Sequence, residues 1–230
     1  MGHEDTARLI DLLRSLASPR NREGMGRFGI NTRRALGVPM PELRKLARLH
    51  RRDHVLAGEL WASGIHEAHI LACLVDDPAL VTEAQMEQWV SDFDSWDLCD
   101  QCCMNLFDST PFAVVNALQC SGRGDDFVKR AGFALMASLA VHDKQAEDKL
   151  FLSFLTVILG ESTDERNFVR KAVNWALRQT GKRNRSLNGA ALKTAGEMAL
   201  LESKSARWNA ADAIRELRSD KVQKKIGGVR

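Results

Sequence analysis

The sequence of 230 residues contains no tyrosine and only five prolines, and it has no long run of apolar residues. Its longest purely apolar run is Ile70–Val75, whereas a membrane-spanning helix needs about 20 residues. The N-terminal stretch Met-Gly-His-Glu-Asp is polar and does not resemble a secretion signal. We therefore expect a cytoplasmic protein that has no contact with a membrane.

Cysteines are few and odd in number, which argues against a framework of disulfides. There are five, and Cys102 and Cys103 are adjacent, so we expect free thiols in a reducing compartment. Cys99-x-x-Cys102 has no second pair to complete a metal site. His66 and His69 lie one helical turn apart but lack a third ligand. The sequence therefore predicts no metal.

The alternation typical of β-strands is also absent. Apolar residues recur at helical spacing from Ala7 to Leu217, which predicts an all-α protein. The glycines of Gly24–Gly29 match a dinucleotide-binding fingerprint, but no βαβ unit surrounds them. We therefore expect no nucleotide cofactor.

Several residues indicate where individual helices begin and end. Pro41 and Pro111 are placed as prolines in the first turn of a helix. Thr82 and Gln85 have the spacing of a capping box, and Gly181 is typical of a helix end. The pattern predicts a dozen or so short helices joined by brief loops.

An internal repeat indicates how these helices are arranged. Phe127–Ala131 is echoed 41 residues later by Phe168–Ala172. Ala176–Gln179 matches Ala213–Glu216 at an offset of 37 residues, and both offsets are close to the length of HEAT-type helix pairs. The sequence therefore predicts HEAT-like repeats stacked into a curved α-solenoid that forms a single domain over residues 1–230.

Positive charge is missing from the middle of the chain. The stretch from Asp53 to Gly122 contains no Lys or Arg but 12 of the 30 acidic residues, although the whole chain has a net charge of +3. The flanks are therefore strongly basic and suited to a polyanion, whereas the middle repels one. The alternative is a basic protein whose charged faces are merely solvated.

The repeated segments carry basic pairs at matching positions. These are Lys129 and Arg130 in the first copy and Arg170 and Lys171 in the second. Since stacked repeats place equivalent positions side by side, we expect a ladder of positive charge along one surface.

One short segment combines an aromatic residue with a carboxylate. Ser95 is a good N-cap, so the helix is expected to begin at Trp96. Asp100 then shares a face with Trp96, Cys103 and Phe107. The helix dipole favours a carboxylate in the first turn of a helix, and Asp100 lies beyond that turn. Either Asp100 is a functional carboxylate or it forms a structural ion pair beside a core tryptophan.

The sequence resembles the AlkD branch of the DNA alkylation-repair glycosylases, which are built from HEAT-like repeats. The resemblance covers roughly residues 29–218, and its four key residues occur in the order expected for this family: Trp96, Asp100, Arg130 and Trp175. The segment Gly37–Arg44 and the repeated helices are also similar to the family's sequences. The lack of tyrosine is a departure, because some members use tyrosines to contact DNA.

The resemblance implies that the protein excises N3- or N7-alkylated purines from double-stranded DNA, without a cofactor and as a monomer. Asp100 would stabilise the sugar cation or activate water, Trp96 and Trp175 would contact the deoxyribose, and Arg130 would touch the phosphate near the lesion. The lesion would lie against the concave surface without entering a deep pocket. Other phosphates would be bound by further basic residues: Lys129, Arg170, Lys171 and Arg178.

Two other functions fit the same pattern. The first is a HEAT-repeat protein that binds DNA through the basic ladder but does not excise bases. The second is a protein-binding scaffold, which is the commonest use of HEAT-like arrays.

Overall fold

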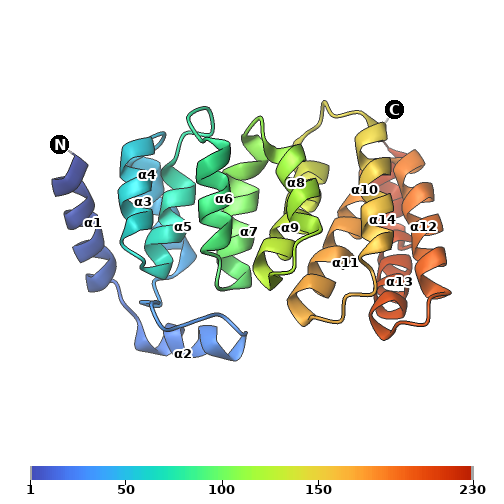
Figure 1. The fold of residues 1–230 in the computed structure, drawn as a ribbon, viewed down its shortest axis with the longest axis horizontal. Coiled ribbons are helices and arrows are strands. Elements are labelled where there is room, and N and C mark those ends of the chain that lie inside the picture. The colour runs from blue at the N-terminus through green and yellow to red at the C-terminus, as the bar shows by residue number, and fades with distance from the viewer. Residues whose placement is uncertain (1, 229–230) are drawn as a thin grey trace. The chain divides into compact units, whose positions relative to one another are not determined.

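The computed structural model describes residues 2–228, and this part of the chain consists of helices joined by short loops (Figure 1). It contains fourteen α-helices, one short 3-10 helix and no strand, which confirms the predicted all-α class. No helix in this part of the chain is long and apolar enough to cross a lipid bilayer. The chain divides into two compact units, Met1–Pro111 and Phe112–Arg230. The single domain expected over residues 1–230 stays a prediction.

The first unit consists of seven α-helices and the 3-10 helix η1. They are α1 (Gly2–Ser15), α2 (Pro19–Arg27), α3 (Met40–Leu49), α4 (His54–Ala62), α5 (His66–Val75), α6 (Glu83–Ser91), α7 (Trp96–Asn105) and η1 (Phe107–Ser109). Helix α5 packs against α3, α4 and α7. The buried indole rings of Trp61 on α4 and Trp89 on α6 stack in parallel, with centroids 3.9 Å apart. Helix α5 therefore has α3, α4 and α7 as neighbours, and α4 also contacts α6 through the stacked rings.

Helix α2 lies across the ends of its neighbours in the first unit (Figure 1). It is preceded by Ser18, whose hydroxyl caps the helix, and Pro19 occupies the first position. The loop after α2 returns to its start, because the backbone nitrogen of Ser18 donates to the carbonyl of Leu36. Gly37 has φ +82°, and a Cβ there would clash with backbone atoms of Ser18 and Arg22. This close approach requires glycine and fixes α2 over the unit.

The second unit consists of seven α-helices. They are α8 (Ala113–Ser121), α9 (Asp126–His142), α10 (Asp148–Gly160), α11 (Asn167–Gly181), α12 (Arg185–Ala199), α13 (Lys204–Leu217) and α14 (Asp220–Gly227). Helices α9, α11 and α13 pack side by side in one layer, and α8, α10 and α12 form the other. The rings of Phe127 and Phe168 are 5.5 Å apart, so the repeat-equivalent positions adjoin as predicted.

Most of the predicted helix ends are confirmed. Pro41 is the second residue of α3, and Gly181 is the last residue of α11. Pro111 was placed wrongly in a first turn, because α8 begins at Ala113 after the N-cap residue Phe112.

The predicted capping box of α6 is only half formed. The hydroxyl of Thr82 accepts from the backbone nitrogen of Gln85 at 3.1 Å, as expected for an N-cap. The side chain of Gln85 donates to the buried carboxylate of Asp76 at 2.7 Å. A tertiary contact has therefore displaced the local one.

The expectation that all five cysteines are thiols is wrong for one pair. Cys73 on α5 and Cys102 on α7 form a disulfide, with their Cα atoms 5.2 Å apart. The two residues are 29 positions apart in the sequence, and only the packing of α5 against α7 brings them together. The remaining thiols are buried in the core: Cys99, Cys103 and Cys120.

Candidate functional site

Helix α7 presents its predicted functional residues on one half-buried face. It begins at Trp96 after Ser95, as predicted, so Trp96 and Asp100 lie one turn apart on that face. The predicted stripe does not continue as a single helix, because α7 ends at Asn105 and Phe107 belongs to η1. Cys103 and Phe107 are fully buried. Asp100 therefore lies where the stripe passes from the surface of the unit into its core.

Trp96 is held in place by the segment that follows α2. Its indole Nε1 donates to the backbone carbonyl of Phe28 at 3.0 Å. This bond joins α7 to the end of α2, although the two residues are 68 positions apart. The orientation of the ring therefore depends on the position of α2.

A buried ion pair lies beside Trp96. The Nε2 atom of His66, the first residue of α5, is 2.9 Å from the Oδ2 atom of Asp97. Burial alone would lower the pKa of His66, but its hydrogen bond to Asp97 and the nearby negative charges raise it above 6.5. Burial alone would raise the pKa of Asp97, but the bond and the charge of His66 lower it. Each partner therefore stabilises the charged form of the other.

Two acceptors in the same region differ in how they are satisfied. The carboxylate of Glu67 accepts from the backbone nitrogens of Leu36 at 2.8 Å and Gly37 at 2.6 Å. Glu67 is thus used to hold the loop, whereas the carboxylate of Asp97 is used to hold His66 and the start of α7, because hydrogen bonds from Ser95 and Leu98 also lower its pKa.

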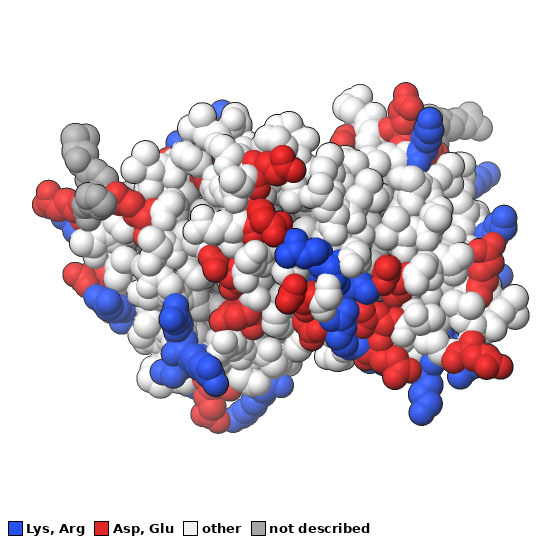
Figure 2. Space-filling view, in the orientation of Figure 1, with Lys and Arg blue, Asp and Glu red and all other residues white. Residues whose placement is uncertain are grey.

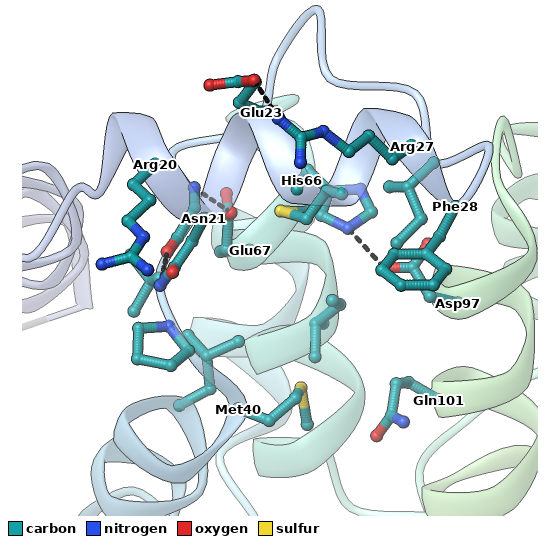
Figure 3. A pocket seen from close by; sticks show the side chains of 18 of the residues that line it. Arg20, Asn21, Glu23, Arg27, Phe28, Met40, His66, Glu67, Asp97 and Gln101 are labelled. Atoms are coloured by element: carbon teal, nitrogen blue, oxygen red, sulfur yellow. Dashed lines mark hydrogen bonds and ion pairs between the residues drawn. The ribbon is translucent and has the colours of Figure 1, made fainter.

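A cavity of about 980 Å³ lies within the first unit (Figure 3). It is lined in part by His66, Glu67, Trp96 and Asp97. Helix α2 passes over it, and the side chains of Arg20, Arg27 and Phe28 extend from that segment. Most of the wall is apolar, with these side chains: Met25, Phe28, Ile30, Val38, Pro39, Met40, Leu43, Ile70 and Trp96. A mostly apolar cavity with a few convergent polar groups is typical of a ligand site.

His66 and His69 do not act together, although they lie one turn apart on α5. His66 faces Asp97, whereas the Nε2 atom of His69 bonds to the carbonyl of Trp61 at 2.8 Å. The ring of His69 also stacks on the indole of Trp61, with centroids 4.2 Å apart. Burial lowers the pKa of His69.

In the second unit, Trp175 lies half-buried on α11. Lys171 and Arg178 lie four residues before it and three after it, so they flank it along the helix. Lys171 is exposed, but Arg178 forms ion pairs with Glu216 and, at 3.6 Å, with Asp212 of α13. The charge of Arg178 is thus used in packing α11 against α13.

Lys129 and Arg130 are buried in the packing of α9, at 8% and 6% exposure. Lys129 pairs with Glu161 and, at 3.0 Å, with Asp164, and these partners raise its pKa although burial alone would lower it. Arg130 donates to the carbonyl of Phe168 at 2.7 Å. The predicted surface ladder therefore does not include these two residues, because their side chains hold the repeats together. Their assignment to the DNA site stays a prediction.

Arg170, a further residue of the predicted ladder, contacts an aromatic ring. Its guanidinium lies 4.7 Å from the ring centroid of Trp208 on α13. Trp208 is 40% exposed. Figure 2 shows basic and acidic side chains mixed over the region of α9 and α11, whereas acidic side chains prevail over α6 and α7. The segregation of charge in the sequence is thus visible on the surface.

Sequence reasoning missed the cavity, the pair of His66 with Asp97, and the exposed Trp208. His66 and Asp97 are 31 residues apart, close to one repeat, so a repeat search in the N-terminal half would have aligned α5 with α7. Trp208 is aligned with Lys171 by the offset of 37 residues, which would have placed it on the α11 and α13 layer.

The comparisons with known proteins agree with this architecture. A family model described as "DNA alkylation repair enzyme" matches residues 9–217. No curated protein matches the chain significantly. One solved structure is similar over 96% of this chain and 95% of its own, with a TM-score of 0.80 and 19% identity. It is described as a new family of proteins related to the HEAT-like repeat DNA glycosylases, with affinity for branched DNA structures. At this identity the likeness shows the HEAT-like repeat fold alone.

Proposed function

Because the chain belongs to the family of DNA alkylation repair enzymes, we propose that it is a DNA glycosylase acting on N3- or N7-alkylated purines in double-stranded DNA. Such a purine carries a positive charge and leaves as a neutral base, so its departure needs little help from a general acid. The demand on the enzyme is to stabilise the positive charge that develops on the deoxyribose. The reaction needs no cofactor.

The observation that carries this proposal is the shared face of Trp96 and Asp100 on α7. Both side chains are half-buried. A carboxylate about 4 Å from the developing sugar cation contributes roughly 4 kcal/mol at an effective dielectric constant near 20. That is about three powers of ten in rate.

In this proposal each aromatic residue contacts the sugar. The face of Trp96 favours a cationic deoxyribose, and Asp100 also orients the attacking water. Trp175 is proposed to contact the sugar in the same way from α11 of the second unit.

The backbone of the DNA is proposed to be held by the basic residues of the second unit. Lys171 is exposed, and Arg170 extends over Trp208, so these two are suited to phosphates. Lys129, Arg130 and Arg178 are engaged in contacts within the unit, and their proposed role is to fix α9, α11 and α13 in place. We propose that the protein acts as a monomer.

Binding of branched DNA without excision is the second candidate. The solved relative has affinity for branched DNA structures, and Trp208 offers an exposed ring on which an unpaired base can stack. In this case Asp100 would have only a structural role.

Release of methylated purines from methylated duplex DNA tests the proposal. We expect the wild-type protein to release 7-methylguanine or 3-methyladenine, and Asp100→Asn to slow single-turnover release about a thousandfold. The variant removes the charge but keeps the shape, so its melting temperature and DNA affinity should remain close to those of the wild type.

Glu83→Gln is the matched control, because Glu83 is an exposed carboxylate on α6 of the same unit. It should excise at the wild-type rate. Wild-type excision by Asp100→Asn would remove Asp100 from the catalytic role. A wild-type protein that releases nothing but binds DNA would establish the second candidate.

A further inference from the structure

The loop between α2 and α3 is fixed to the first turn of α5 by its later half. The backbone carbonyl of Arg34 accepts from the backbone nitrogen of His66 at 3.1 Å. The carboxylate of Glu67, which is 1% exposed, accepts from the backbone nitrogens of Leu36 and Gly37. Hydrogen bonds to a charged acceptor are about twice as strong as those between neutral groups. This half of the loop is therefore held firmly against α5.

The earlier half of the same loop contacts the start of α7. The backbone carbonyl of Phe28 accepts from the indole Nε1 atom of Trp96 at 3.0 Å. The side-chain amide of Asn31 donates to the Oδ2 atom of Asp94 at 2.7 Å. These two bonds lie on either side of Ser95, whose side chain makes no capping hydrogen bond to α7. The loop therefore supplies two of the bonds that hold the start of this helix.

A tight turn at the end of α2 directs the loop toward α7. Gly29 has φ +76°, which lies in the left-handed region that favours glycine. The backbone nitrogens of Gly29 and Ile30 donate to the carbonyls of Gly26 and Met25, so the chain reverses directly after the helix. Because Phe28 immediately precedes Gly29, this turn sets the direction in which the carbonyl of Phe28 points.

The orientation of the Trp96 ring matters for the proposed reaction. The ring is half-buried, so packing restrains it only in part, and the bond from its Nε1 atom restrains its rotation further. An aromatic face attracts a cation that lies over the ring. A displacement of about 1 Å in a reacting site can reduce the rate about a hundredfold. A fixed ring is therefore needed beside the developing sugar cation.

We propose that Asn31 and the backbone carbonyl of Phe28 position Trp96 for the reaction. The inference rests on the proposed function and adds two positioning groups to it, neither of which touches the reacting atoms. The carbonyl of Phe28 acts directly on the indole, whereas Asn31 acts through Asp94 and the start of α7. The loop thus holds Trp96 both by its ring and by the backbone that precedes it.

The experiment exchanges the two partners of the Asn31 hydrogen bond. Asn31→Asp places a second carboxylate beside Asp94, so that repulsion replaces the bond. Adding Asp94→Asn restores one donor and one acceptor to the pair, with their places exchanged. The matched control is Asn105→Asp, which adds the same charge at the exposed last residue of α7, where the amide bonds to Gln101 of the same helix.

Two properties of each variant are measured. The first is the NMR signal of the Trp96 indole N–H and the exchange of its proton with water, the signal being identified by its absence in Trp96→Phe. The second is single-turnover release of 7-methylguanine from methylated duplex DNA. We expect Asn31→Asp to shift the signal, to speed the proton exchange and to slow release roughly tenfold. Its DNA affinity should stay close to that of Asn105→Asp.

The double exchange should restore both the signal and the release rate, and Asn105→Asp should change neither. Melting temperatures show that each variant is folded. The proposal is overturned if the Trp96 signal of folded Asn31→Asp equals that of the wild type. It is also overturned if the double exchange does not restore the signal, or if the signal moves while the release rate stays the same.

Failure of this inference is distinguishable from failure of the proposed function. A wild-type protein that releases no purine removes the glycosylase activity, whereas the indole signals still show whether the loop holds Trp96. Release at the same rate by wild type and Asn31→Asp leaves the activity standing and removes the positioning role.

Discussion

Trp208 has a partly exposed ring, and its replacement tests whether unpaired bases of DNA stack on it. We expect Trp208→Ala to weaken binding of DNA with unpaired bases by about tenfold or more, because stacking on an aromatic ring contributes about 1–3 kcal/mol per base. Trp208→Phe retains a ring and should retain most of the affinity. Fluorescence anisotropy with a labelled junction and a labelled blunt duplex measures both effects.

Leu200→Ala is the control for Trp208, since Leu200 is also an exposed apolar residue of the second unit, in the turn after α12. It should bind both DNAs as the wild type does. Equal affinity of Trp208→Ala and wild type for the junction would show that no base stacks there.

The pair of His66 and Asp97 makes stability depend on pH in a predictable direction. The folded pKa of His66 is raised above 6.5, so its contribution is fully present below 6.5 and is lost as pH rises through the folded value. The pKa of Asp97 is lowered, so its contribution is present above 3.8 and is lost at more acidic pH. The pair should therefore stabilise the protein most between these two values.

We expect His66→Gln to reduce the melting temperature most in this window and progressively less as the pH rises. The measurement is the difference in melting temperature between wild type and variant across the pH range. His50→Gln, at the C-cap of α3, is the control. A difference that does not change with pH would mean that the charge of His66 contributes nothing.

At the scale of the helices, the loop between α10 and α11 is tied to α9 by a network of charges. Asp164 bonds to Arg166 at 2.6 Å and to Lys129 at 3.0 Å. Burial would raise the pKa of Asp164, but Arg166 and Lys129 lower it from 3.8 to about 2. A shift of this size corresponds to about 2 kcal/mol of stability, present above pH 3.8 and lost as pH falls toward 2.

We expect Asp164→Asn to lower the free energy of unfolding by about 2 kcal/mol at neutral pH, and by less in acid. Urea unfolding at several pH values measures this. Glu197→Gln breaks an exposed pair with Lys193 and should change the free energy by about 0.5 kcal/mol or less. Equal effects of the two variants would show that the network adds no stability.

Most helix ends with local signals were predictable from the sequence, and Pro111, which lies before α8 and not in its first turn, is an exception. The structure confirms the helix start at Trp96 after Ser95 and the positions of Pro41 in α3 and Gly181 in α11, although the side chain of Ser95 makes no capping hydrogen bond. The disulfide between Cys73 and Cys102 was not predictable, because it depends on two helices packing side by side. The contact of Gln85 was not predictable either, because its side chain donates to Asp76 and does not cap its own helix.

The candidate site was predictable only in part, for the same reason. The spacing of Trp96 and Asp100 fixes their common face, whereas the cavity beside Trp96 is built from loops and helices across some 80 residues of the chain. Burial also changed the meaning of the basic pairs. Lys129 and Arg170 occupy equivalent positions in the repeat. Lys129 forms an ion pair with Asp164, whereas Arg170 lies over the ring of Trp208, because the adjacent repeats carry different residues.

For the whole molecule, the salt dependence of DNA binding measures how many basic residues meet phosphates. Each neutralised phosphate contributes about 0.9 to the slope of log affinity against log salt. We expect the double variant Arg170→Gln with Lys171→Gln to reduce this slope by about two units. Lys149→Gln with Lys193→Gln, which removes exposed charges from the α10 and α12 layer, should leave it unchanged.

The slope also separates phosphate contacts from stacking at the same surface. Trp208→Ala should lower the affinity for junction DNA at every salt concentration and leave the slope as it is, because stacking on a ring releases no counterions. Loss of the Arg170 and Lys171 charges should weaken DNA binding mainly at low salt, where the electrostatic contribution to affinity is largest. If the double variant kept the wild-type slope while binding DNA, the phosphate contacts would have to lie on other basic residues of the flanks.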